Sequence, residues 1–265
     1  MKQVATIFAV IYFFTFSGYA MAELKESLIL YFDFEEGKGI EVTDKSANKT
    51  IGELKGANVK WMDGKPGKAV DFIPSVWLEI KESEHLTLVD EGTISAWVNI
   101  RSSSPSKWRP VVAKGGTTDK NVNYVLDVRE NAPRLYIGNG TDPAACYDES
   151  KKIDFDKWHF IAGTFDGKQM KLFVDGDFTV TFTQPFKPKE NIDMLSVGSY
   201  SLDQANNSPN GMIDNVAVFK KALSKDELAT IMNGGLKGVL AIASENKLTT
   251  TWGNIKGKSE KRFLF

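Results

Sequence analysis

The stretch from Trp158 to Phe182, WHFIAGTFDGKQMKLFVDGDFTVTF, constrains the fold more than any other part of the chain. It predicts three consecutive antiparallel strands, because the two Asp-Gly dipeptides inside it accept the positive φ angles of tight hairpin turns. Period-two alternation predicts one core-facing side for each strand. The predicted core-facing sets are Trp158, Phe160, Ala162 and Thr164, then Met170, Leu172 and Val174, then Phe178, Val180 and Phe182. The chain is therefore expected to be a β protein with a long meander.

Composition and charge narrow the function classes. The 265 residues are 42% hydrophobic and 25% charged, which is an ordinary globular composition. The formal net charge of -1 gives no basis for a nucleic-acid partner. One cysteine, Cys146, and two histidines, His85 and His159, exclude a disulfide framework and a His/Cys zinc cluster within one chain. Any metal would have to be bound by oxygen ligands.

Residues 1–22 predict a signal peptide. Lys2 provides a positive start, Val4–Phe16 is an apolar segment, and Ala20-Met21-Ala22 is a small-x-small cleavage site. An uncleaved membrane anchor is the alternative, since Val4–Ala22 approaches spanning length. The cleavage site favours export. We therefore expect a mature chain that begins near Glu23, has no membrane span, and is secreted or lies at the cell surface or in the periplasm.

Short strand patterns separated by turn residues fill most of the remaining chain. Beside the meander, strands are expected at Leu28–Phe34, Val70–Phe72, Val76–Ile80, Ile94–Ile100, Lys107–Lys114, Tyr124–Arg129, Arg134–Ile137, Met194–Val197 and Met212–Phe219, with a loop at Gly138–Tyr147. One short helix is expected between a capping box at Ser224 and Glu227 and the pair Gly234-Gly235. Many strands and one helix predict an all-β, antiparallel two-sheet sandwich, with a closed barrel as the alternative. The predicted domain covers residues 23–235, and residues 236–265 form a tail or linker.

The order of these segments resembles the laminin-G-like jelly-roll domains of the concanavalin A-like lectin/glucanase superfamily. The segments that carry the resemblance are YFDFEEGKG (31–39), DKSANKTIG (44–52), DGKPGKAVDF (63–72), TISAWV (93–98), WHFIAGTFDGKQMKLFVDG (158–176) and GMIDNVAVFKKALSKDEL (211–228). Each motif is weak alone, but together they cover about residues 28–235 in the right order. The resemblance implies a jelly-roll sandwich and a secreted or surface module, as bacterial members of the family mostly are.

The resemblance also implies a structural calcium site. The matching positions are Asp33 in the first strand motif, Asn48 in the Asp44–Asn48 loop, through its carbonyl, and Asp214 in the closing I-D-x-V strand. Calcium accepts six to eight oxygens and combines carboxylates with backbone carbonyls. The chain departs from the family pattern at Ala47, where a glycine is common. The alternative is that both aspartates accept hydrogen bonds from loop amides.

No catalytic constellation stands out in the sequence. Glucanases of this fold resemble E-x-D-x-x-E or E-x-D-x-E on one strand, and no such run lies in a strand pattern here. Glu79, Glu82 and Glu84 are the densest acidic group, and their neighbours are typical of a solvated edge. His159 has no nucleophile motif beside it. We therefore expect a non-catalytic module, with a carbohydrate-active enzyme as a weaker alternative.

A binding role is the favoured expectation, and it rests on analogy with the fold. Aromatic side chains stack on sugars, and planar polar groups hydrogen-bond their hydroxyls. The candidate ligand-binding residues are Trp108, Arg109, Arg129, Arg134, Tyr136, Tyr147 and Tyr200. The expected partner is a glycan or an extracellular protein. The rival is a purely structural or adhesive module with no small-ligand site.

Overall fold

The structure is a computed structural model that describes residues 21–104, 106–115, 121–183, 185–200, 208–238 and 240–241. The chain divides into two compact units. One comprises Leu28–Ala229, and the other comprises the residues before Leu28 and those from Thr230 on. In the second unit, residues 21–27 and the described residues from 230 are helical. Most of the predicted signal peptide and most of the predicted tail lie outside the described residues, so the domain limits at 22 and 235 stay predictions.

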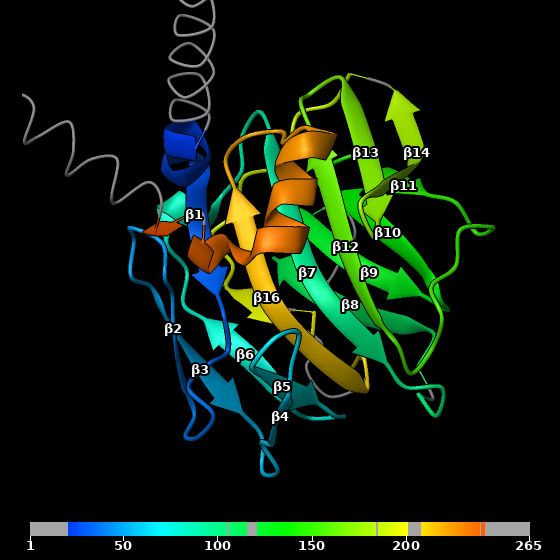
Figure 1. Ribbon diagram of the computed structural model, residues 1–265. Coiled ribbons are helices and arrows are strands. Elements are labelled where there is room, and N and C mark those ends of the chain that lie inside the picture. The colour runs from blue at the N-terminus through cyan, green and yellow to red at the C-terminus, as the bar shows by residue number, and fades with distance from the viewer. Residues whose placement is uncertain are drawn as a thin grey trace, which may run out of the picture. The chain divides into compact units, whose positions relative to one another are not determined.

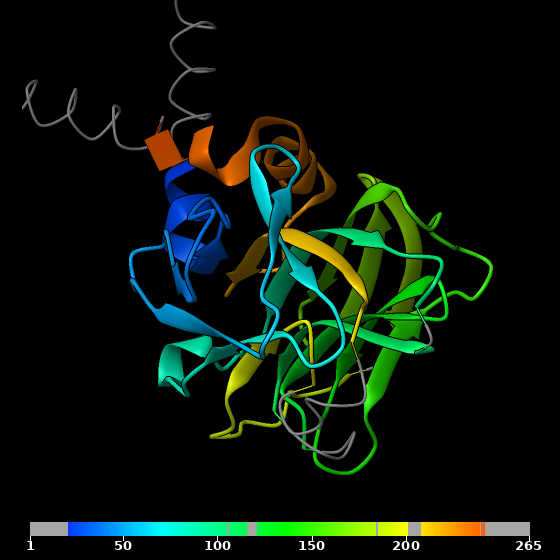
Figure 2. The ribbon, with the colours of Figure 1, turned by 90° about the horizontal axis from the view of Figure 1, so that it is seen from below.

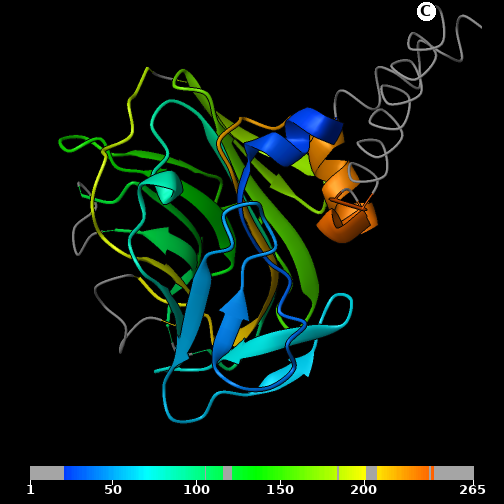
Figure 3. The same ribbon diagram turned by 90° about the vertical axis from the view of Figure 1, so that its left-hand side faces the viewer.

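The Leu28–Ala229 unit consists of two antiparallel sheets of eight strands each. Sheet A runs β14 (Asp177–Thr183), β13 (Gln169–Val174), β12 (Trp158–Phe165), β7 (Gly92–Ile100), β16 (Gly211–Phe219), β5 (Lys68–Phe72) and β4 (Trp61–Asp63), and β1 (Leu28–Phe32) also pairs with β16. Sheet B runs β11 (Ala144–Tyr147), β10 (Ala132–Ile137), β9 (Tyr124–Arg129), β8 (Trp108–Lys114), β15 (Leu195–Val197), β6 (Trp77–Ile80), β3 (Ile51–Lys55) and β2 (Glu41–Thr43). A short 3-10 helix, η1 (Glu84–Leu86), follows β6. Both sheets have free ends, so the predicted two-sheet sandwich is confirmed over the closed barrel (Figures 1 and 3).

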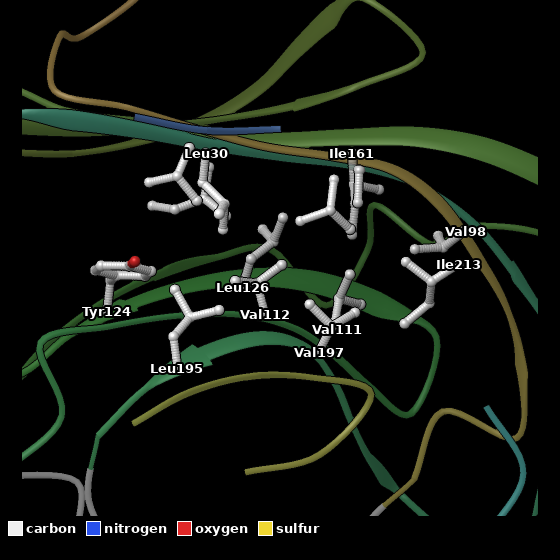
Figure 4. Packing of buried hydrophobic residues seen from close by; sticks show 14 of the residues in the cluster. Leu30, Val98, Val111, Val112, Tyr124, Leu126, Ile161, Leu195, Val197 and Ile213 are labelled. Atoms are coloured by element: carbon white, nitrogen blue, oxygen red, sulfur yellow. The ribbon is translucent and has the colours of Figure 1, made fainter. Parts of the chain in front are cut away.

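The core lies between the two sheets. Leu30, Val98, Ile161 and Ile213 of sheet A point toward side chains of sheet B (Figure 4). The facing side chains of sheet B are Val111, Val112, Tyr124, Leu126, Leu195 and Val197. Alternate side chains of each strand in sheet B point into the core, so the remaining side chains lie on the outer face. That outer face carries most of the predicted ligand-binding residues.

The meander forms as predicted, but the predicted core-facing sides are only partly correct. In β12 the core takes Ile161 and Phe165, whereas Phe160 packs on the outside against Trp97, with ring centroids 5.6 Å apart. The prediction failed because β12 is buried on both sides, so alternation could not identify the core side. In β14 a register shift flanked by the Leu172 and Phe173 pairs turns Phe178 to the outside, where it is 49% exposed.

Several elements were absent from the sequence-based expectation. Strands β2, β3, β4 and β11 lie in segments expected to be loops or left unassigned. They are three to five residues long, which is too short for alternation to mark them. The helix begins at 225 as expected, but helical structure runs on to 238 even though Gly235 has a left-handed φ of 66°. Within the described residues, no helix is long and apolar enough to cross a membrane.

Candidate ligand-binding site

Strand pairing brings most of the candidate ligand-binding residues together on the outer face of sheet B. Arg134 of β10 lies opposite Tyr147 of β11 on one side and Asp127 of β9 on the other. Trp108 of β8 lies opposite Arg129 of β9. Their in-between neighbours point into the core. The green strands that carry these residues gather at the end of the unit away from the blue β2–β3 hairpin (Figures 1 and 2).

A buried ion pair forms the centre of this face. The Arg134 guanidinium donates two hydrogen bonds to Asp127, at 3.0 Å from Nε and 2.6 Å from Nη2. The Tyr200 hydroxyl donates to the same carboxylate at 2.8 Å. The Asp127 side chain is fully buried and that of Arg134 is 11% exposed. Tyr136 is also buried, within 4.9 Å of the Arg134 guanidinium. Hydrogen bonds join Arg134, Asp127 and Tyr200, and the Tyr136 ring packs on Arg134; we call these four residues the framework.

Trp108 lies at the edge of the framework and is engaged by two cations. The guanidinium carbons of Arg129 and Arg134 each lie 4.9 Å from the centre of its indole ring. Cation–π contacts of this kind are each worth about 0.5–2 kcal/mol. Trp108 remains 38% exposed, so part of the ring is open to a ligand. A ligand that stacked on this ring would compete with the arginine contacts.

A hollow opens beside this framework, at the turn between β9 and β10. Its volume is about 50 Å³, and it opens to solvent. Its walls are Arg129, Glu130, Asn131, Ala132, Tyr147, Glu149 and Lys152. Arg129 and Tyr147 are on the predicted list, and the other five were missed, because the turn and the segment after β11 meet only through strand pairing. The hollow is small and rimmed by an aromatic ring and charged groups.

Arg109 is the one predicted ligand-binding residue that the structure places elsewhere. It lies opposite the core residue Val128 of β9, and Arg109 itself is only 5% exposed. It donates to the Glu130 carbonyl and lies 5.3 Å from the centre of the Phe155 ring. Burial lowers the pKa of its guanidinium. The side chain thus supports the turn that lines the hollow from behind.

The far half of the same outer face is acidic. Glu41, Glu53 and Glu79 lie directly opposite one another on β2, β3 and β6, and Lys55 contacts Glu53 at 2.8 Å. Their spacing in the chain does not predict this alignment, because it arises only when the three strands pair. Tyr200 and Val122 pack over the middle of the sheet, on Ala113 and Val125. The acidic row and the hollow therefore form two separate ends of the face.

The predicted metal ligands Asp33 and Asp214 lie near Tyr31 on sheet A. Burial raises the pKa of the Tyr31 hydroxyl, and the charges of Asp33, Asp214 and Glu35 raise it further. Asp214 is fully buried, and burial raises its pKa to about 7. Its Oδ2 accepts the Lys65 backbone N–H at 2.6 Å, and its Oδ1 accepts the Asn215 backbone N–H at 2.7 Å. Lys45 lies 3.6 Å from Asp33.

The carboxylates of Asp33 and Asp214 are oxygen ligands of the kind that a hard cation takes. A Cβ at Gly64 would lie 2.6 Å from Asp214 Oδ2, and one at Gly67 would overlap the Glu35 carboxylate. These glycines keep open the space that the carboxylates occupy. Among the described residues, no group of three or more His, Cys, Asp or Glu side chains is placed to hold a metal. A cation here would need backbone or hydroxyl oxygens beside the carboxylates.

The Asp44–Asn48 loop has a structural role of its own. Asp44 accepts hydrogen bonds from the backbone N–H groups of Tyr31, Ser46 and Thr50. The Asn48 amide donates to the Ile29 carbonyl at 2.8 Å. Ile29 precedes Asp33 by four residues of extended chain, roughly 13 Å at strand spacing. The Asn48 side chain therefore ties the loop to β1, and binding of a cation by its carbonyl stays a prediction.

His159 and Cys146 are the two other residues with reactive side chains, and the fold holds one by hydrogen bonds and buries the other. His159 Nδ1 lies 2.7 Å from Asp175 Oδ2, and its Nε2 accepts the Asp154 backbone N–H at 3.2 Å. Cys146 is 1% exposed, and burial raises its pKa to about 11. A neutral, buried thiol is a poor nucleophile. Neither residue has the arrangement that nucleophilic catalysis needs.

Several solved structures share this fold. The binding domain of Paraclostridial Mosquitocidal Protein 1 matches with a TM-score of 0.63 at 17% identity, over 80% of this chain and 53% of its own. Domain 4 of AbnA, a GH43 extracellular arabinanase from Geobacillus stearothermophilus, in complex with arabinotriose, matches with a TM-score of 0.62 at 16% identity, over 78% and 98%. The botulinum neurotoxin serotype D ligand binding domain, in complex with N-acetylneuraminic acid, matches with a TM-score of 0.63 at 17% identity, over 81% and 52%.

The chain spans about half of the length of the first and third of these structures. At such identities the likeness shows the fold alone. No curated protein matches the chain in sequence. A family model does match, over residues 76–229, which is more than half of the chain. The chain therefore belongs to the Laminin_G_3 family, of the concanavalin A-like lectin/glucanases superfamily.

Proposed function

We propose that this protein is a non-catalytic, glycan-binding module whose ligand occupies the hollow beside β9, β10 and β11. The observation that carries the proposal is the contrast between a satisfied framework and an open rim. Arg134, Asp127 and Tyr200 bind one another, whereas Tyr147 and the Arg129 side chain stay 36% and 40% exposed at the hollow. Ligand sites commonly combine exposed aromatic and polar side chains that rigid surroundings hold in place. Among the similar folds, one structure contains arabinotriose and another N-acetylneuraminic acid.

A glycan array probed with the protein tests this proposal. We expect binding that Tyr147→Ala weakens by about tenfold, the effect of losing one stacking contact of roughly 1–1.5 kcal/mol. Phe178→Ala is the matched control, because Phe178 is an exposed aromatic residue on sheet A. An empty array would favour the rival, an extracellular protein partner or a purely structural or adhesive module. Hydrolysis of a bound oligosaccharide would contradict the non-catalytic part.

We also propose that the Tyr31 end of sheet A holds a structural calcium ion. Asp33 and Asp214 would bind it, with Glu35 close by. A bound divalent cation would offset the burial that raises the pKa of Asp214, and the smaller repulsion by Glu35. EDTA should then lower the Tm, and Asp214→Asn should remove that sensitivity. Free calcium at a hundred times the Kd of the site would raise the free energy of unfolding by about 2.7 kcal/mol. An unchanged Tm in EDTA would contradict the calcium site and favour hydrogen bonding from the loop amides alone.

We further propose that the protein is exported from the cytoplasm and that its signal peptide is cleaved. The N-terminal segment and the family membership support a module that acts outside the cytoplasm, where glycans and extracellular proteins are available. Mass spectrometry of the protein from the periplasm or medium should show a mature N-terminus near Glu23. A full-length chain that stays with the cytoplasm would contradict the proposed location.

A further inference from the structure

We infer that the ligand of the hollow is an uncharged saccharide rather than an acidic one, an inference that rests on the proposed function. The charges on the walls carry it. Arg129 and Lys152 are cationic, and Glu130 and Glu149 are anionic. The four charges sum to zero. The walls therefore carry no net charge to attract an anionic or a cationic ligand; Lys107, which is not a wall residue, contacts Glu130 at 3.6 Å.

The framework behind the hollow does not alter this balance. The charge of Arg134 is cancelled by Asp127 through two hydrogen bonds, and both side chains are largely buried. A neutralised guanidinium gives no field that draws a carboxylate or a sulfate group. Arg129 is then the exposed guanidinium of this site, and its Nη1 lies 4.0 Å from Glu149 Oε1. Exposed pairs at this distance contribute little, so both groups can turn to a ligand.

The types of hydrogen-bonding group point to hydroxyls. Arg129 and Lys152 can only donate hydrogen bonds, whereas Glu149 can only accept them. A ligand hydroxyl does both, so neighbouring hydroxyls of one sugar ring can serve Arg129 and Glu149 together. A ligand carboxylate could accept hydrogen bonds from Arg129. It would then lie close to the Glu149 carboxylate, because Arg129 Nη1 is 4.0 Å from Glu149 Oε1. Like charges in that position are repelled.

The aromatic wall agrees with a sugar ring. Tyr147 pairs with Arg134 across β10 and β11, which holds its backbone in a fixed place, and its side chain stays 36% exposed. Pyranose and furanose rings carry an apolar C–H face beside their hydroxyls. That face can pack on Tyr147 while the hydroxyls reach the Arg129 and Glu149 side.

The test is an array that pairs neutral oligosaccharides with uronic-acid and sialic-acid counterparts of equal length, followed by calorimetry with the strongest neutral hit and its acidic counterpart. We expect the neutral form to bind at least tenfold more tightly. Its affinity should change little between low and high salt, because screening acts mainly on net charge attraction. Glu149→Gln should weaken the neutral ligand and narrow its lead over the acidic one. Lys151→Gln, an exposed change next to the hollow, is the control and should have no effect.

Several results would overturn the inference. Hits confined to acidic glycans would do so while leaving glycan binding in place, as would affinity that falls steeply with salt. Equal discrimination by the wild type and by Glu149→Gln would remove Glu149 from recognition and overturn it too. An array without hits would instead contradict the proposed function, and the inference with it. Glu149 is 72% exposed in its side chain, so the substitution should leave folding unchanged.

Discussion

At the scale of single residues, Asp127 is the most consequential side chain on the outer face of sheet B. It accepts hydrogen bonds from Arg134 and Tyr200 while fully buried. Asp127→Asn would leave the Arg134 guanidinium buried without its counter-ion, a change that typically costs about 3–5 kcal/mol. We expect a loss of that size in the free energy of unfolding, measured by urea denaturation. Asp154→Asn removes an exposed pair with Lys157 and should change it little. Equal effects of the two substitutions would contradict the framework.

Cys146 gives a residue-scale prediction that depends on pH. Burial raises the pKa of its thiol from 9.0 to about 11. Because the folded pKa exceeds the unfolded one, the Cys146 contribution to stability is fully present below pH about 9 and is lost as the pH rises through about 11. At pH 8 the thiol should react with DTNB only after unfolding in denaturant. Rapid reaction of the native protein would show that the thiol is accessible and contradict this burial.

At the scale of elements, turns and caps were predictable, and strand faces were less so. Asp175 and Gly176 both have positive φ, as the hairpin prediction requires. Phe178 turned outward because a register shift in β14 cannot be seen in the alternation of the sequence. Residue type determines the local hydrogen bonds of turns and caps. The side that a strand buries depends instead on which element covers it.

The capping box is the clearest element that can be tested. The Glu227 carboxylate accepts the Ser224 backbone N–H at 2.8 Å, and the Ser224 hydroxyl accepts the Glu227 backbone N–H at 3.3 Å. Ser224→Ala removes one of these partners and should lower the free energy of unfolding by about 1 kcal/mol. Ser224→Thr keeps the hydroxyl and should retain most of that stability. A similar loss in both variants, in chemical denaturation, would contradict the capping role.

At the scale of the whole molecule, the sandwich was predictable and the hollow was not. Six motifs in order and repeated alternation indicated two sheets, because each motif reports a local strand. The hollow needs Arg129, Tyr147 and Lys152 to meet across β9, β10 and β11. That meeting depends on strand order, which no local pattern encodes. The sequence therefore predicts the strands that carry the wall residues, but it does not predict which of these residues lie side by side.

The main core cluster lies entirely within the Leu28–Ala229 unit, from Ile29 to Val218. We therefore expect a fragment of residues 28–229 to fold on its own, with one cooperative thermal transition and a β-type circular dichroism spectrum. Leu126→Ala in this fragment should lower the free energy of unfolding by about 2–5 kcal/mol, since Leu126 is fully buried. A fragment without a cooperative transition would show that the residues outside 28–229 are needed for folding.

The division between framework and rim also bears on how the protein can change over time. Stability on this face is concentrated in Asp127, Arg134 and Tyr136, which a ligand does not need to touch. In the proposed site, recognition is left to exposed positions such as Arg129, Tyr147 and Glu149, whose replacement removes little buried surface. Substitutions at these positions should therefore be well tolerated, and a library randomised there should stay folded while its preference among sugars diverges. The same scaffold could then acquire new specificities by a few surface changes, without passing through unfolded intermediates.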